Sequence, residues 1–126
     1  MARILIVDDD PDVVEAISLF LRKEGHELAA AHDRDAGMEQ VGKFKPDLIV
    51  LDVMMAQPDD GIAMAQDLRR QGFKKPILML TSVSKATGLE FERDEDLMPV
   101  DDFQEKPIEP ATLVAKVKEL LKKSEG

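Results

Sequence analysis

The sequence predicts an α/β domain in which a parallel β-sheet carries helices on both faces. Short aliphatic runs alternate along the chain with longer segments whose apolar residues recur every three or four positions. The strongest aliphatic run is almost continuous, as expected for a strand that is covered on both faces. A chain of 126 residues has the usual size of one domain, and we expect one domain of repeated β/α units.

The first part of the chain predicts two strand and helix pairs. A strand is expected over residues 4–7, and the following helix begins near Pro11 and ends near Gly25. Proline is favoured in the first turn of a helix and glycine just after its last turn. Residues 27–31 predict the second strand, and a weaker amphipathic stretch over residues 33–45 predicts the second helix.

The middle of the chain predicts the centre of the sheet. Residues 47–53 form its most hydrophobic run and are expected to be a fully buried central strand. A third helix is expected to follow Gly61 and to end near Gly72, and the fourth strand is expected over residues 76–80.

The last part of the chain is less regular before it ends in a helix. Residues 82–99 are acidic with few apolar positions, and they predict a short or frayed helix and a loop. A brief fifth strand is expected over residues 100–103. The final helix is predicted by one apolar stripe, formed by Leu113, Val114, Val117, Leu120 and Leu121.

Charge and composition exclude several classes of protein. The net charge of −9 should repel nucleic-acid backbones and anionic membrane surfaces, so we expect no direct binding to either. The absence of cysteine excludes a disulfide scaffold, a thiolate nucleophile and a cysteine-ligated metal site. The apolar run at residues 4–7 is too short for a signal peptide or a spanning helix, and a cytoplasmic location is expected.

Five polar side chains are expected at one edge of this sheet. Asp8 and Asp9 follow the first strand, Asp52 lies on the third, and Thr81 and Lys106 follow the fourth and fifth. Ligands of open parallel sheets bind outside the carboxyl ends of the strands. Because crowded carboxylates repel one another unless a cation lies among them, and because hard oxygen ligands suit Mg²⁺, we expect a magnesium site here.

A carboxylate in such a site can act as a nucleophile toward phosphorus. It would form an aspartyl phosphate while Mg²⁺ and a lysine neutralise charge on the transferring group. Asp52 is the predicted acceptor, because it lies on the central strand between the acidic pair and Lys106. An unpaired carboxylate within an aliphatic run would otherwise be costly.

Four motifs occur in order on the expected elements: Ile6-Val7-Asp8-Asp9-Asp10, Leu51-Asp52-Val53-Met54-Met55, Leu80-Thr81-Ser82 and Asp102-Phe103-Gln104-Glu105-Lys106-Pro107. With these motifs the chain resembles a response-regulator receiver domain from end to end. The resemblance implies a flavodoxin-like, doubly wound sheet of five parallel strands in the order 2-1-3-4-5. It also implies a stand-alone receiver domain over residues 1–126, with no output domain.

The resemblance assigns a ligand set for Mg²⁺. Asp8 and Asp9 would be the acidic pair, and Asp9 the more direct ligand. The Asp52 carboxylate and the backbone carbonyl of Met54 would complete the ligands from the protein.

The resemblance also implies a phosphorylation-dependent signalling switch or relay. A histidine kinase or a histidine phosphotransfer protein would supply the phosphoryl group, and the domain would catalyse its own slow dephosphorylation. Lys106 would pair with the phosphoryl group, Thr81 would hydrogen-bond one of its oxygens, and the Phe103 rotamer would report that movement. A downstream protein would then bind the face formed by the helix after the fourth strand, the fifth strand and the final helix.

Two features depart from the usual pattern of the family. Ala56 stands where a proline commonly follows the two methionines, and one extra residue precedes Gly61. The spacing between Thr81 and Phe103 is longer than usual and unusually acidic. These departures bear on the shape of the loop beside the site and on any partner contact through residues 82–99.

Some of these polar and aromatic residues also have simple structural interpretations. Asp10 before Pro11 is predicted to be a helix N-cap and not a metal ligand. Phe103 is equally well interpreted as ordinary packing at a strand end. His26 and His32 flank a predicted strand without nearby ligand partners, and both are predicted to be surface residues.

Two other functions remain open at this point. Asp8-Asp9-Asp10 also resembles the motif of haloacid-dehalogenase-like phosphatases, with Asp8 as nucleophile and Asp10 as acid/base. That hypothesis leaves Asp52 without a role, and the chain is short for that fold. The other possibility is a receiver-shaped binding module that does not use phosphate.

Overall fold

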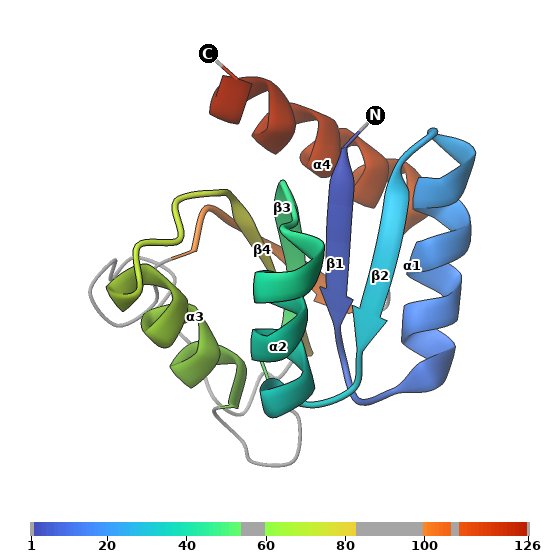
Figure 1. Cartoon of the computed structure of the whole chain (residues 1–126). Helices are drawn as coiled ribbons and strands as arrows, with labels where there is room; N and C mark the ends of the chain where they lie inside the picture. The colour runs from blue at the N-terminus through green and yellow to red at the C-terminus, as the bar shows by residue number, and fades with distance from the viewer. Residues whose placement is uncertain (1, 54–59, 83–99, 107–108, 126) are drawn as a thin grey trace.

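The computed structural model describes residues 2–53, 60–82, 100–106 and 109–125. Strands and helices alternate along the chain as far as β4 (Figure 1), and the described elements are β1 Arg3–Val7, α1 Pro11–Lys23, β2 Glu27–Ala31, α2 Arg34–Phe44, β3 Leu48–Asp52, α3 Asp60–Arg70, β4 Ile77–Ser82, β5 Asp102–Lys106 and α4 Pro110–Glu125. The strands form one five-stranded sheet in the order β2-β1-β3-β4-β5, and every pairing is parallel. The predicted fold class and strand order are confirmed.

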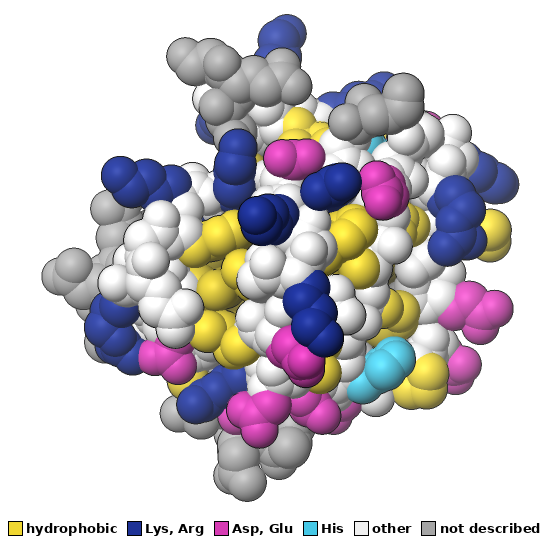
Figure 2. Space-filling model, in the orientation of Figure 1, with side chains coloured by type: hydrophobic (Ala, Val, Ile, Leu, Met, Phe, Trp, Pro, Cys, Tyr) yellow, Lys and Arg dark blue, Asp and Glu magenta, His cyan; other side chains and the backbone are white. Residues whose placement is uncertain are grey.

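The sheet separates two hydrophobic cores. Successive side chains of a strand point to opposite faces, so Ile4 and Ile6 of β1 pack with α1 and α4, whereas Leu5 and Val7 pack on the side of α2 and α3. The strands β3 and β4 divide their apolar residues in the same way. Figure 2 shows hydrophobic side chains on both sides of α2 on the second of these faces.

The first helix forms where its sequence signals place it. Pro11 occupies its first turn, and the Asp10 side chain accepts a hydrogen bond from the Asp12 amide at 3.0 Å, which confirms the predicted N-cap. Gly25 follows the helix with φ of 90°, a conformation that other residues adopt only with strain. These signals direct the chain from the end of β1 back to the start of β2.

Three predicted boundaries are wrong by a few residues. The fifth strand is Asp102–Lys106 instead of 100–103, because backbone pairing with β4 continues through polar residues that carry no hydrophobic signal. For the same reason β4 runs two residues past its predicted end, to Ser82. The helix α3 begins at Asp60, so that Gly61 lies inside its first turn. The expected helix and loop at 82–99 lie, apart from Ser82, outside the described residues.

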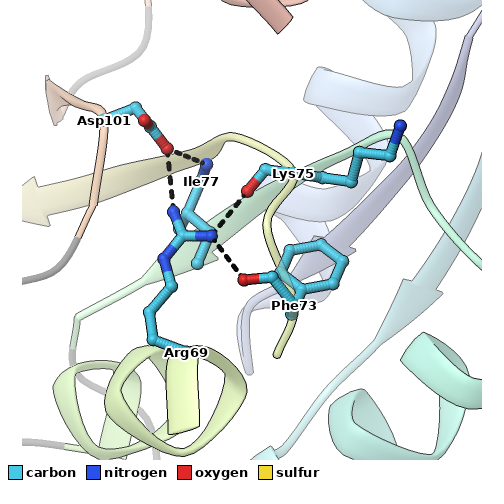
Figure 3. Close-up of polar contacts among 5 residues, drawn as sticks. All are labelled: Arg69, Phe73, Lys75, Ile77 and Asp101. Atoms are coloured by element: carbon cyan, nitrogen blue, oxygen red, sulfur yellow. Dashed lines mark hydrogen bonds and ion pairs between the residues drawn. The ribbon is translucent and has the colours of Figure 1, made fainter. Parts of the chain in front are cut away.

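Arg69 ties the end of α3 to the start of β4 and to the residue before β5 (Figure 3). Its guanidinium group donates to the carbonyl oxygens of Phe73 and Lys75, at 2.9 and 2.8 Å, and to Asp101 Oδ2 at 2.9 Å. The same Asp101 oxygen accepts a hydrogen bond from the Ile77 amide at 2.8 Å. This network holds the N-terminal ends of β4 and β5 in place. These ends lie on the opposite side of the sheet from the C-terminal ends of the strands.

Arg69→Met is expected to lower the free energy of unfolding by about 1 to 3 kcal/mol, because three hydrogen bonds from a charged group are lost. Urea denaturation followed by far-UV circular dichroism measures the change. Arg70→Met is the matched control. The Arg70 side chain is 70% exposed and pairs only with Asp67 among the described residues, so its loss should change the free energy of unfolding by no more than about 0.5 kcal/mol. Equal effects of the two substitutions would contradict this role for Arg69.

Candidate functional site

The carboxyl ends of the strands bring acidic residues together at one edge of the sheet. Asp8 directly follows β1, and Asp52 is the last residue of β3. The strands β1 and β3 are neighbours in the centre of the sheet, with Val7 in register with Leu51. Because the strands are parallel, the two aspartates leave the sheet side by side.

Asp8, Asp9 and Asp52 form one cluster of carboxylates. Each side chain offers an oxygen atom, and these oxygens all lie within 4.8 Å of one another. Asp8 is fully buried and Asp52 is only 5% exposed, whereas Asp9 is exposed. The cluster therefore combines a buried interior with one side that is open to a ligand.

The turn after β1 separates the roles of three consecutive aspartates. The Asp8 amide donates to the carbonyl of Ala31 in β2 at 3.1 Å, and Asp8 Oδ1 accepts a hydrogen bond from the Asp10 amide at 2.9 Å. Asp10 itself caps α1 and takes no part in the cluster. Only Asp8 and Asp9 of this run therefore face Asp52.

The cluster fits a small divalent cation. Two of these neighbouring carboxylates, Asp8 and Asp52, are buried, and a cation among the three would offset their mutual repulsion. Mg²⁺ binds oxygen ligands at about 2.1 Å in octahedral geometry, so opposite ligands lie about 4.2 Å apart. The oxygens of the cluster lie within 4.8 Å of one another, which is close enough for one ion to contact more than one of them, and Asp9 is on the exposed side.

Gly61 fixes the backbone of Asp52, and the sequence interpretation missed this role. Its amide donates to the Val53 carbonyl at 2.8 Å. A Cβ atom on Gly61 would lie 1.9 Å from the carbonyl oxygen of Asp52 and 2.7 Å from Val53 Cα, both of which are backbone atoms. Sequence patterning carries no signal for this contact, because Gly61 is predicted to precede the third helix and not to lie within its first turn.

The strands β4 and β5 end at the same edge as the acidic cluster. Leu80 is in register with Asp52, which places half-buried Thr81 one position beyond it. Lys106 is the last residue of β5 and is in register with Ser82. The structure thus places the Thr81 and Lys106 backbones at the predicted edge, and the roles of their side chains stay predictions. Met54 lies outside the described residues.

Phe103 lies next to Met79 of β4 in register. It is partly buried and packs against the core on the side of α2 and α3. Its packing is confirmed, and its role as a switch stays a prediction.

The prediction that both histidines are surface residues is confirmed for His32, which is exposed, and is wrong for His26. His26 is half-buried, and its Nδ1 atom accepts a hydrogen bond from the Ala2 amide at 3.1 Å. Burial lowers the pKa of His26 from its ordinary value, which favours the neutral ring that this bond requires. His32 is exposed, but its Nδ1 atom lies 3.2 Å from the carbonyl oxygen of Asp8. Local spacing gave no signal for either contact, since both link residues that are 24 positions apart.

None of the helices described here has the length and apolar character needed to span a membrane.

Sequence comparisons place these features in one family. The family model of the response regulator receiver domain matches residues 4–118. The alkaline phosphatase synthesis transcriptional regulatory protein PhoP of Bacillus subtilis is 37% identical, over 98% of this chain and 50% of its own length. The DNA-binding response regulator MtrA of Mycolicibacterium smegmatis is 36% identical, over 98% of this chain and 52% of its own. The chain therefore spans about half the length of these curated relatives.

Solved structures agree with the sequence comparisons. A putative response regulator from Chloroflexus aurantiacus is 33% identical with a TM-score of 0.83, and the match covers 95% of this chain and 97% of that one. The BeF3-activated receiver domain of Klebsiella pneumoniae RstA is 30% identical with a TM-score of 0.81, over 94% and 97% of the two chains. The fold thus matches that of solved receiver domains.

Proposed function

The chain belongs to the response-regulator receiver family, and we propose that it is a phosphorylation-dependent signalling switch that accepts a phosphoryl group on Asp52. The observation that carries this proposal is the position of the Asp52 carboxylate, which is buried at the end of the central strand with Asp8 and Asp9 beside it. Neither the phosphatase nor the phosphate-independent module is supported by the comparisons.

Asp52 is the proposed nucleophile. One of its carboxylate oxygens bonds to phosphorus while the bond from phosphorus to the histidine nitrogen of the donor breaks, which leaves an aspartyl phosphate. The close approach of Gly61 to the Asp52 backbone holds the nucleophile in one position during this step.

Asp8, Asp9 and Asp52 are the proposed ligands of Mg²⁺, together with the backbone carbonyl of Met54. The bound ion supplies neutralising charge to the phosphoryl oxygens during transfer. Asp8 is held by its backbone and side-chain hydrogen bonds, so its carboxylate is available in a fixed position. Asp9, on the exposed side of the cluster, is proposed to be a more direct ligand than Asp8.

The remaining site residues are proposed to convert phosphorylation into a change of shape. The phosphoryl group replaces a single negative charge by about two and adds acceptor oxygens. Lys106 and Thr81, at the ends of β5 and β4, are proposed to contact these oxygens, and Phe103 is proposed to follow their movement. If the inactive conformation outnumbers the active one by 99 to 1, reversing that ratio requires contacts that favour the active conformation by roughly 5.5 kcal/mol of free energy. A few charge-assisted hydrogen bonds can supply this difference.

The proposed partners are proteins. A histidine kinase or a histidine phosphotransfer protein would donate the phosphoryl group in the cytoplasm, and a downstream protein would bind β5, α4 and the segment before β5. The net charge of −9 argues against direct binding to nucleic acid. The transcriptional and DNA-binding roles in the names of PhoP and MtrA belong to those proteins, of which this chain matches about half.

Incubation with acetyl phosphate and Mg²⁺ is expected to add one phosphoryl group to the chain, because the acidic cluster holds both the acceptor and the metal ligands. Intact-protein mass spectrometry measures the mass shift. Excess EDTA is the control and should abolish the mass shift, because no metal ion then neutralises the negative charge of the transferring phosphoryl group. A shift that is the same with EDTA as with Mg²⁺ would exclude the proposed metal dependence. The 30% identical RstA receiver, which is BeF3-activated, supports the use of BeF3 as a second probe.

A further inference from the structure

We propose that His32 is a positioning residue of the acidic site. Its ring holds the peptide group between Asp8 and Asp9, and through that peptide it places the Asp9 carboxylate for the metal. This inference rests on the Mg²⁺ binding of the proposed function. It adds a residue that follows the edge strand β2 to an acidic cluster otherwise built at the ends of β1 and β3.

The contact between His32 and the turn is polar and directional. His32 directly follows β2, and its Nδ1 atom lies 3.2 Å from the carbonyl oxygen of Asp8. Because a carbonyl oxygen only accepts hydrogen bonds, the contact is a hydrogen bond when Nδ1 carries the proton. The preceding residue, Ala31, accepts a hydrogen bond from the Asp8 amide at 3.1 Å. Two consecutive residues at the end of β2 thus hold both polar groups of the Asp8 backbone.

This contact controls the position of Asp9. The Asp8 carbonyl and the Asp9 amide belong to one planar peptide group, so fixing the oxygen fixes the direction in which the chain continues. Within the part of the chain that the structure describes, the exposed Asp9 carboxylate has no hydrogen bond or ion pair of its own. Its place beside Asp8 and Asp52 therefore depends on the backbone that carries it.

Asp8 does not depend on His32 to the same degree. It is fully buried, so packing in the core keeps its side chain in place even when its hydrogen bond from the Asp10 amide is weakened. Loss of the His32 contact should therefore loosen Asp9 and the Asp10 amide while the Asp8 side chain stays in the core. Metal affinity should fall without a large change in the stability of the fold, because His32 itself is exposed.

The test compares two substitutions of His32 with Mg²⁺ alone as the probe. His32→Leu keeps much of the bulk but removes the donor, and it is expected to weaken Mg²⁺ binding about threefold to tenfold, as loss of one orienting hydrogen bond does. His32→Asn places an amide donor near the Nδ1 position and should restore affinity to within about twofold of wild type. Isothermal titration calorimetry at one pH measures both.

His26→Gln is the matched control. His26 also bonds to backbone, through the Ala2 amide, but at the opposite edge of the sheet, so this change should leave the Mg²⁺ affinity unaltered. A metal-free readout comes from amide hydrogen exchange: in His32→Leu the Asp10 amide should exchange faster, while amides in the central strands keep wild-type protection.

The outcomes separate this inference from the function on which it rests. If wild type binds Mg²⁺ and His32→Leu binds it equally well with unchanged exchange at Asp10, His32 has no positioning role and the site itself stands. If His32→Leu and His32→Asn weaken binding to the same extent, the donor is irrelevant and the inference is wrong. If wild type binds no Mg²⁺, both the inference and the proposed metal site are wrong.

Discussion

Asp52→Asn is expected to abolish the mass shift that acetyl phosphate and Mg²⁺ produce in the wild-type chain. Asparagine has nearly the same shape as aspartate, so the end of β3 and its packing should be kept. Its amide is not a nucleophile toward phosphorus, and no other carboxylate of the cluster lies at the same position on the central strand. Intact-protein mass spectrometry, with circular dichroism as the check on folding, measures the result.

Asp8→Asn is the matched control for this experiment. It changes a neighbouring buried carboxylate of the same cluster, and it should leave the acceptor in place while weakening Mg²⁺ binding by at least about tenfold. A slower but measurable phosphorylation is therefore expected at saturating Mg²⁺. The opposite pattern, in which only Asp8→Asn removes the acceptor, would favour a phosphatase-like nucleophile at Asp8 and would exclude the proposed role of Asp52.

The fold could be predicted from the sequence because two strong physical signals agree. The aliphatic runs of β1, β3 and β4 are continuous since their side chains enter two cores alternately, and the helical segments carry one apolar face each. The fifth strand could be placed only approximately. It lies at the edge of the sheet, and its pairing with β4 comes from backbone hydrogen bonds that extend through Gln104, Glu105 and Lys106.

The acidic cluster could also be predicted, whereas the residues that hold it could not. Parallel strands must end at the same edge, so the sequence order of Asp8 and Asp52 already implies that they meet. The contact of His32 with the Asp8 carbonyl depends on the exact register of β2 against β1. The contact of Gly61 with Asp52 depends on how α3 returns to the sheet. Neither contact produces a hydrophobic periodicity or a residue spacing that can be recognised in the sequence.

Gly61→Ala is expected to lower the free energy of unfolding by about 2 kcal/mol or more, because the added methyl group overlaps atoms that cannot move alone. Its Cβ would lie 1.9 Å from the Asp52 carbonyl oxygen and 2.8 Å from the Asp52 carbonyl carbon, and both atoms belong to the backbone of a central strand. Differential scanning calorimetry should show a fall in Tm of about 5 °C or more. The displaced Asp52 should also bind Mg²⁺ more weakly.

The effect is specific to the space around Gly61, and two other glycines test this. Gly42→Ala, on the exposed side of α2, meets no atom within 4 Å and should raise the free energy of unfolding by about 0.5 to 1 kcal/mol, because alanine favours the helix. Gly37→Ala meets the Cε atom of Met64 at 2.9 Å, the mobile end of a side chain, and should cost less than Gly61→Ala. If Gly61→Ala kept both the wild-type Tm and the wild-type Mg²⁺ affinity, the proposed close packing of α3 against the backbone of Asp52 would be wrong. A measured fall in both would support the close contact between the start of α3 and the backbone of Asp52.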